Sequence, residues 1–263
     1  MKVSHAFAIC AYGESPYLET CIRSLKAQTV KSEIIICTST PSEFLNEIAA
    51  RYELPIYVRT GEPGIGRDWN FAYEAASLRA DLVTLAHQDD MYLRDYTQTV
   101  LKMKRRYPDM SLFTTASVTA MDRELAEPGL IEHVKSLLRL PLIFPQLNAY
   151  RCVKRASITW GNPIICPSCT YDPAMCGHEP FDEGYKFVLD WKLLEKLADR
   201  DGRWVYIRKP LIIYRVHSDA ATGQCIADHT REHEESEMFD RLLPAPVAGV
   251  VKRLYRVSYT AYR

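Results

Sequence analysis

Residues 82–90 read Leu-Val-Thr-Leu-Ala-His-Gln-Asp-Asp, an apolar run that stops abruptly at four polar side chains. A continuous apolar run of this length is typical of a strand that is buried on both faces of a sheet. Similar runs lie upstream at 6–11, 33–37 and 56–58, and each is followed by a segment with helical features. Strands that alternate with helices in this way predict βαβ units and a mostly parallel α/β sheet.

The segments between these runs carry helix signals. Ser15-Pro16 is a favourable helix start, and apolar residues then recur with helical spacing through residue 25. The tetrapeptide 40–43, Thr-Pro-Ser-Glu, predicts a capping box for a second helix. The remaining expectations are helices over 66–76, 93–107, 131–140 and 187–198, a strand at 111–115, a linker-like stretch over 116–150, a strand within 158–171, and extended segments at 204–207 and 211–216.

Composition narrows the class of protein. The 263 residues carry 33 basic and 33 acidic side chains, so the formal net charge is zero, and 47% of residues are hydrophobic. These values exclude wholesale disorder and argue against bulk electrostatic binding of nucleic acid. The sequence has no apolar run near the roughly 20 residues that cross a bilayer, and it starts without a secretory signal. We therefore expect a cytoplasmic protein, or one held peripherally at the inner face of a membrane.

The cluster His87-Gln88-Asp89-Asp90 is the first candidate site. Two adjacent carboxylates at the end of a buried strand are costly unless a positive group lies beside them. Mg²⁺ and Mn²⁺ sites use one or two carboxylates together with substrate phosphates, so this cluster is a candidate metal site. The alternative is that Asp89 or Asp90 caps the helix that follows.

Two later segments offer further candidates. Asp190 lies in an apolar helical context, where desolvation raises the pKa of a carboxyl group and suits it to act as a general base. The alternative is a surface aspartate paired with Lys186 one turn away. His217 follows an expected strand, where a histidine is either a ligand or simply part of the structure.

These pieces, in this order and spacing, resemble the family-2 glycosyltransferases of the GT-A fold over roughly residues 5–220. No single motif decides the resemblance, but the ordered set is specific. The matching segments are Cys10-Ala11-Tyr12-Gly13, Tyr17-Leu18, Glu62-Pro63-Gly64 with Asn70, His87-Gln88-Asp89-Asp90, Phe181-Asp182-Glu183, Leu189-Asp190-Trp191 and Tyr214-Arg215-Val216-His217. The resemblance implies a GT-A-type, Rossmann-like, mixed and mostly parallel sheet flanked by helices.

The resemblance also implies roles for the residues. Asp89 and His217 would bind Mn²⁺ or Mg²⁺ at the diphosphate of a nucleotide-diphospho-sugar donor, and Asp190 would be the catalytic base. The residues implied to contact the donor are Ala11, Tyr12, Glu14, Thr38, Ser39, Gly64, Asn70, His87, Gln88 and Asp90. The implied activity is metal-dependent, inverting, hexosyltransferase-like transfer to a glycan or lipid-linked acceptor in polysaccharide biosynthesis.

The sequence departs from the family pattern at two places. Thr38 and Ser39 stand where family members usually carry aspartates, one of which binds uracil, so the preference for a UDP-sugar is weakened and a dTDP-sugar stays open. His87 replaces the first aspartate of the Asp-x-Asp motif, which lowers the expected metal affinity.

Three alternatives remain at this stage. A catalytically silent nucleotide-sugar-binding relative acting in a complex would explain both departures. A sugar-phosphate nucleotidyltransferase shares the alternating pattern but needs a Gly-rich loop after the first strand, where only Gly13 is present. Cys166, Cys169, Cys176 and His178 could instead hold a structural zinc ion.

The chain divides in composition near residue 223. We expect a glycosyltransferase domain over 1–223, with a nucleotide-sugar half over 1–115 and an acceptor half over 116–223, followed by a helical extension over 224–263. Residues 252–263 are basic and aromatic, with no acid. Residues 245–263 could therefore contact an anionic membrane, pack as a plain helix, or form a homodimer contact.

Overall fold

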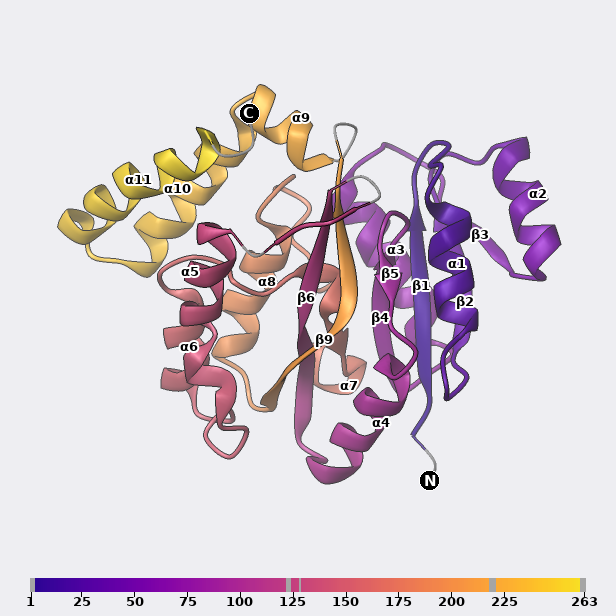
Figure 1. Ribbon diagram of the computed structural model, residues 1–263, viewed down its shortest axis with the longest axis horizontal. Helices are drawn as coiled ribbons and strands as arrows, with labels where there is room; N and C mark the ends of the chain where they lie inside the picture. The colour runs from indigo at the N-terminus through magenta and orange to yellow at the C-terminus, as the bar shows by residue number, and fades with distance from the viewer. Residues whose placement is uncertain (1–2, 122–123, 128, 218–220, 261–263) are drawn as a thin grey trace.

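The protein is built around a single mixed sheet with helices on both faces (Figure 1). The computed structural model describes residues 3–121, 124–127, 129–217 and 221–260. The strand order is β3-β2-β1-β4-β8-β6-β9-β5, and β7 pairs with β6 outside this path. Two clusters of buried apolar side chains fill the spaces between the sheet and its helices. The sequence-based prediction of an α/β sheet is confirmed.

The elements have the following bounds. The strands are β1 (His5–Ala11), β2 (Glu33–Thr38), β3 (Ile56–Val58), β4 (Leu82–His87), β5 (Met91–Tyr92), β6 (Met110–Met121), β7 (Glu124–Leu125), β8 (Thr170–Tyr171) and β9 (Arg203–Val216). The helices are α1 (Leu18–Lys26), α2 (Glu43–Tyr52), α3 (Ile65–Ser77), α4 (Tyr96–Arg106), α5 (Leu130–Leu138), η1 (Leu140–Ile143), α6 (Arg151–Ile158), η2 (Cys166–Ser168), α7 (Pro173–Cys176), α8 (Leu189–Ala198), α9 (Ala221–Ala227), α10 (Thr230–Leu242) and α11 (Ala245–Thr260).

The first four strands run parallel, as their apolar runs predict. Cys10 on β1 lies between Cys37 on β2 and His87 on β4, so the three strands end at the same edge of the sheet. In a parallel sheet this edge, beyond the carboxyl ends of the strands, is where ligands bind. The polar residues that follow β1, β2 and β4 therefore gather at one place.

The second half of the sheet differs from the sequence-based expectation. β6 continues to Met121, so part of the expected linker over 116–150 is strand. The two expected extended segments near Pro210 form one strand, β9, which runs parallel to β6 with a register shift opposite Ala116. The strand expected within 158–171 is present as the short antiparallel strand β8, whereas β5 was missed because its two residues carry no periodic signal.

The helix starts are also shifted from their predicted positions. Tyr17, rather than Ser15, precedes α1, and no side chain caps that helix. α2 is capped by Ser42, whose hydroxyl accepts a hydrogen bond from the Leu45 N–H at 3.2 Å. α4 begins at Tyr96 after Asp95, later than predicted, which leaves the carboxylates at the end of β4 outside the helix.

The C-terminal helices lie against α8. Glu234 on α10 is buried and accepts hydrogen bonds from the backbone N–H groups of residues 186, 187 and 188, at 2.8–3.0 Å. Phe239 packs edge-on against Trp191 on α8 and against Tyr255 on α11. α10 therefore fixes the segment that leads into α8. Within the described residues, no helix is both long enough and apolar enough to span a bilayer.

Candidate active site

The end of β4 and the end of β9 meet at the ligand-binding edge of the sheet. Arg215 on β9 donates its backbone N–H to Asp90 Oδ1 at 2.9 Å and its Nε–H to the carbonyl oxygen of Asp89 at 3.0 Å. Asp90 is 2% exposed, and this burial raises the pKa of its carboxyl group well above its ordinary value. Its second oxygen, Oδ2, makes no hydrogen bond within the described residues.

Asp89 and His217 form a candidate ligand pair. Asp89 Oδ2 lies 3.4 Å from His217 Nε2, and that nitrogen has no hydrogen-bond partner among the described residues. Two donors bound to one cation at about 2.1 Å are typically about 3 Å apart, so this spacing fits a shared divalent ion. The alternative that Asp89 or Asp90 caps the next helix is wrong, since that position belongs to Asp95.

The alternative zinc site is not formed. Cys166, Cys169 and Cys176 are buried, whereas His178 is exposed and its Nδ1 contacts Glu74 at 3.0 Å. Among the residues that the structure describes, no three His, Cys, Asp or Glu side chains are grouped so that they could hold a metal. The Asp89–His217 pair supplies two ligands, and a cation there would take the others from phosphate oxygens and water.

His87, the last residue of β4, packs against an aromatic side chain of the core. Its ring is 5.0 Å from the ring of Trp69, and burial lowers the pKa of His87 to about 4. The imidazole is therefore neutral at physiological pH. Its Nε2 atom is buried and has no hydrogen-bond partner in the described part of the chain.

Asp190 stands in the first turn of α8. Its Oδ2 accepts a hydrogen bond from Asn162 Nδ2 at 2.9 Å, and its Oδ1 accepts one from the Trp191 N–H at 2.7 Å. Burial raises the pKa of Asp190 to about 6, although these hydrogen bonds and the charge of Lys135 on α5 act in the opposite direction. The carboxylate is thus held by Asn162 and its own helix, instead of the predicted alternative partner Lys186.

The start of α8 lies close to the ligand-binding edge. Gly66, in the first turn of α3, is so close to α8 that an added Cβ would lie 3.0 Å from Leu189 Cδ2, on the residue before Asp190. α3 follows β3, and its first turn therefore sits at the carboxyl end of the parallel strands. Burial raises the pKa of the Cys166 thiol well above its ordinary value, and the nearby Asp190 and Cys10 act in the same direction; Cys10 is the register neighbour of His87.

The residues expected to contact a donor occupy different environments. Tyr12 is 62% exposed, and its backbone N–H and carbonyl are both hydrogen-bonded to the Gln88 amide, at 3.1 and 2.9 Å. Ala11 ends β1 and is buried, Glu14 is exposed, and Gly64 immediately precedes α3. These residues line the loops that follow β1 and β3.

The Asn70 side chain has a structural role, because it binds the loop at 181–183. Its Oδ1 accepts the Phe181 N–H at 2.9 Å, while its Nδ2 donates to the Phe181 carbonyl at 2.9 Å and to Glu183 Oε1 at 3.4 Å. The side chain is 4% exposed, and both ends of its amide are engaged. Asn70 therefore holds the loop at 181–183 against α3. Both of its amide hydrogens are already used, so none remains to bind a nucleotide-sugar.

Thr38 and Ser39, at the end of β2, lie beside a charged pair that the sequence analysis missed. Ser39 donates its hydroxyl to Asp68 Oδ2 at 3.0 Å, and Arg59 Nε contacts Asp68 Oδ1 at 2.6 Å. A carboxylate from α3 thus stands close to the place where the family pattern has one on β2. Asp68 looked like an ordinary first-turn acid, so only the tertiary contact identifies it.

A comparison with models of protein families identifies the family of this chain. The model of glycosyl transferase family 2 matches residues 6–170, more than half of the sequence. The chain belongs to glycosyl transferase family 2. This confirms the resemblance drawn from the ordered motifs. No curated protein matches the chain.

Solved structures with low sequence identity to this chain share its fold. S. aureus TarS 1-349 in complex with UDP-GlcNAc has a TM-score of 0.60 at 14% identity, over 83% of this chain and 60% of that one. The mannosyltransferase PcManGT from Pyrobaculum calidifontis, in complex with GDP-Man and Mn²⁺, has a TM-score of 0.63 at 14% identity, over 95% and 68%. Glucosyl-3-phosphoglycerate synthase from Mycobacterium tuberculosis, with Mn²⁺, UDP and glucosyl-3-phosphoglycerate, has a TM-score of 0.57 at 12% identity, over 92% and 81%. The predicted GT-A-type fold is confirmed, and the chain spans less than two thirds of the TarS structure.

Proposed function

We propose that this family-2 protein transfers a sugar, with inversion, from a nucleotide-diphospho-sugar to an acceptor hydroxyl. The proposal rests on the different environments of two carboxylates, Asp89 and Asp190. Asp89 is paired with His217 Nε2 at a spacing suited to a cation, whereas Asp190 is desolvated and has a pKa of about 6. One group suits the leaving diphosphate and the other suits an incoming alcohol.

The mechanism follows from these environments. An alcohol is a weak nucleophile, so Asp190 takes its proton as the new glycosidic bond forms, and attack from the face opposite the diphosphate inverts the anomeric carbon. Asn162 holds the receiving carboxylate in place through its bond to Oδ2. A Mn²⁺ or Mg²⁺ ion held by Asp89 and His217 would, when bound, neutralise charge on the diphosphate as the sugar leaves. His87 offers a neutral ring nitrogen to the donor.

The donor is proposed to be a UDP- or dTDP-sugar that lies over the ends of β1, β2 and β4. Structural neighbours are shown with UDP-GlcNAc, GDP-Man and UDP, which supports a nucleotide-sugar of some kind. Ala11, Tyr12 and Glu14 would form one side of this site, and Thr38 and Ser39 the other. The remaining proposed donor contacts are Gly64, His87, Gln88 and Asp90.

The acceptor is proposed to be a lipid-linked or membrane-associated glycan, as in polysaccharide assembly. α5 supports this choice because none of its residues is buried and three of its large apolar side chains, Leu130, Val134 and Leu137, are exposed. An exposed apolar surface of this kind could contact a lipid. The charge of Lys135 on the same helix lowers the pKa of Asp190, which places α5 in the neighbourhood of the proposed base. The protein would then work at the cytoplasmic face of a membrane.

The C-terminal helices supply a proposed second contact with the membrane. Within residues 245–263, Val250 and Leu254 on α11 are 58% and 69% exposed. The side chains from Arg256 onward lie outside the described residues, and the homodimer contact is the competing use of this segment. We keep the proposed division into a glycosyltransferase domain over 1–223, with its 1–115 and 116–223 halves, and an extension over 224–263.

A catalytically silent relative is the second candidate function. It is favoured by one observation: His87 occupies the position of a metal-binding aspartate and is neutral. A silent protein would bind a nucleotide-sugar tightly without consuming it.

Donor hydrolysis and transfer with and without Mn²⁺ separate these functions. We expect wild-type turnover that EDTA abolishes and Mn²⁺ restores, and a loss of about 10²–10⁴-fold in kcat for Asp190→Asn, because the proton acceptor is removed. Asp201→Asn, an exposed acid beyond the other end of α8, is the matched control and should retain activity. Tight donor binding with no turnover in the wild type would instead identify the silent relative.

A further inference from the structure

Ser15 holds one oxygen of Asp89 in a fixed position. In the loop between β1 and α1, the Ser15 hydroxyl donates to Asp89 Oδ1 at 2.7 Å, and Ser15 is 8% exposed. The other oxygen, Oδ2, is the one that faces His217. The serine therefore sets which oxygen of Asp89 is presented to the histidine.

Tyr17, two residues later, packs against the other half of the pair. Its ring lies 5.0 Å from the His217 ring, and the Arg215 guanidinium carbon lies 4.3 Å from the centre of the same tyrosine ring. Arg215 in turn donates to the carbonyl oxygen of Asp89. Tyr17 thus supports the end of β9 on which His217 stands.

The two loop residues are joined to each other. The Tyr17 N–H donates to Ser15 Oγ at 3.3 Å, and the Leu18 N–H donates to the Ser15 carbonyl oxygen at 3.3 Å. Ser15 was expected to cap α1, but its hydroxyl hydrogen goes to Asp89 while Tyr17 takes the cap position. A short loop from β1 therefore contacts both members of a pair that comes from β4 and β9.

We propose that Ser15 and Tyr17 are positioning residues for the metal site: together they hold Asp89 Oδ2 and His217 Nε2 at ligand spacing before a cation arrives. This inference rests on the proposed function, since it concerns the same cation. Because the serine hydroxyl occupies Oδ1, Asp89 acts as a one-oxygen ligand through Oδ2. Partners that orient metal ligands typically contribute 10–100-fold to metal affinity.

Mn²⁺ titration followed by electron paramagnetic resonance tests the proposal without any activity assay. We expect Ser15→Ala and Tyr17→Leu each to raise the Mn²⁺ dissociation constant by about 10–100-fold. Ser15→Thr keeps the hydroxyl and Tyr17→Phe keeps the ring, so both should stay near the wild-type value. Ser4→Ala is the matched control, because it removes an equivalent Ser–Asp hydrogen bond, to Asp81 Oδ2 at 2.8 Å, at the opposite end of β4.

The outcomes are distinguishable. If the wild type binds Mn²⁺ and Asp89→Asn weakens it, but Ser15→Ala and Tyr17→Leu bind as the wild type does, the positioning role is wrong and the proposed function stands. If the wild type binds no Mn²⁺, or if Asp89→Asn binds it unchanged, the metal assignment in the proposed function fails and the positioning role fails with it.

Discussion

Asp190 is the residue whose chemistry depends most directly on its surroundings. With a pKa of about 6, its carboxyl group is protonated below that pH and cannot accept a proton from the acceptor alcohol. We expect kcat/KM to rise about tenfold per pH unit up to roughly pH 6 and then to level off. A pH–rate profile measured with excess donor and Mn²⁺ checks this.

Substituting Asn162 tests whether Asp190 is the titrating group, because the direction of the pKa shift can be predicted. Its hydrogen bond to Asp190 Oδ2 favours the charged carboxylate and so lowers the pKa. Asn162→Ala should therefore move the acidic limb of the profile to higher pH, whereas Asn46→Ala, an exposed position on α2, should leave it in place. A limb that does not move would assign the titration to another group.

At this scale the sequence indicated the acids and the histidine but missed their partners. Asp89, Asp190 and His217 stand out because polar residues at strand ends or in apolar contexts are unusual. Ser15 was noted only as a helix start and Arg215 only as part of a matching motif, and no sequence signal marked Asn162, Arg59 or Asp68. These residues act through contacts with residues that are distant along the chain. Nothing in local spacing records such a contact.

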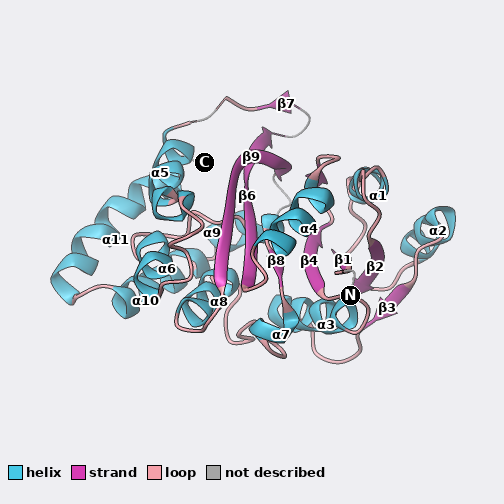
Figure 2. Ribbon diagram, turned by 90° about the horizontal axis from the view of Figure 1, so that it is seen from below, coloured by secondary structure: helices cyan, strands magenta, loops and turns pink. Residues whose placement is uncertain are grey.

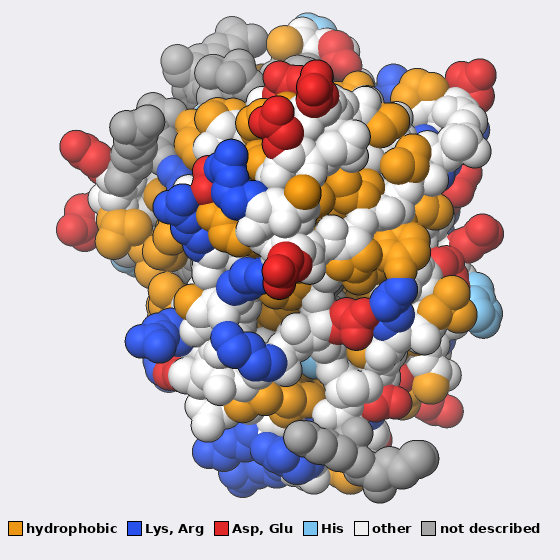
Figure 3. Space-filling view, turned by 90° about the vertical axis from the view of Figure 1, so that its right-hand side faces the viewer, with side chains coloured by type: hydrophobic (Ala, Val, Ile, Leu, Met, Phe, Trp, Pro, Cys, Tyr) orange, Lys and Arg blue, Asp and Glu red, His pale blue; other side chains and the backbone are white. Residues whose placement is uncertain are grey.

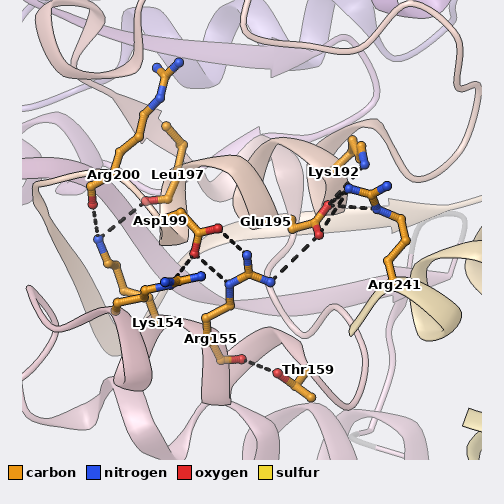
Figure 4. A network of polar contacts seen from close by, with 10 residues as sticks. Lys154, Arg155, Thr159, Lys192, Glu195, Leu197, Asp199, Arg200 and Arg241 are labelled. Carbon is orange, nitrogen blue, oxygen red and sulfur yellow. Dashed lines mark hydrogen bonds and ion pairs between the residues drawn. The ribbon is translucent and has the colours of Figure 1, made fainter. Parts of the chain in front are cut away.

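α8 is the element that ties the proposed base to the rest of the molecule. The buried Lys154 on α6 donates its Nζ hydrogens to the carbonyl oxygens of Leu197 and Arg200, at 3.4 and 2.6 Å (Figure 4). It also donates to the Gly202 carbonyl oxygen at 3.1 Å. These carbonyls lie at and beyond the C-terminal end of α8, where a cation is favourable. A lysine thus fixes one end of the helix that carries Asp190 at the other.

Salt bridges join α8 to α6 and to α10. Glu195 on α8 contacts Lys192 at 3.1 Å, Arg241 on α10 at 3.2 Å and Arg155 on α6 at 3.8 Å (Figure 4). Arg155 also bonds Asp199 at the end of α8. The carboxylate of Glu195 is nearly buried, so this network connects α6, α8 and α10 more firmly than exposed pairs would.

Removing the buried cation should destabilise the fold. Lys154→Met keeps most of the apolar stem but removes the lysine donor from the carbonyl oxygens of Arg200 and Gly202, while the Leu197 carbonyl keeps the Arg200 N–H. We expect a loss of about 2–4 kcal/mol in the free energy of unfolding. Urea denaturation followed by circular dichroism measures it. Lys196→Met, an exposed lysine on α8, is the control and should change stability by less than about 0.5 kcal/mol.

The elements themselves were largely predictable where they were long. The strands over 82–87 and 5–11 followed from continuous apolar runs, whereas β9 was expected as two pieces because Pro210 interrupts its pattern. The structure accommodates this proline at the irregular register opposite Ala116. Sequence periodicity cannot show that two extended segments share one strand.

At the scale of the whole molecule, the exposed apolar helix α5 and the first three strands lie on different sides. α5 and α11 lie on the side away from β1, β2 and β3 in both ribbon views (Figures 1 and 2). On the opposite side, acidic and basic side chains are interspersed with apolar ones (Figure 3). The exposed apolar residues of α5 therefore mark the side that we expect to meet a lipid-linked acceptor.

Charge placed on α5 should weaken use of such an acceptor. In Leu130→Glu/Leu137→Glu, two side chains that are 81% and 63% exposed become acidic, and we expect at least a tenfold rise in KM for an acceptor presented in anionic vesicles. Donor hydrolysis should be unchanged. Leu78→Glu, at an 88% exposed position after α3, is the matched control. Equal KM values for all three proteins would show that α5 does not contact the acceptor.

Glu234 connects the last helices to the start of α8, which carries the proposed base. Its carboxylate accepts the three amide hydrogens that precede α8, and in this way it sets where that helix begins and how Asp190 is aimed. Neither residue lies in the portion recognised by the family model, which ends at residue 170. A version of this protein trimmed to its recognisable portion would lose the proposed proton acceptor, and one cut just before α10 would keep that residue without the carboxylate that supports the start of its helix.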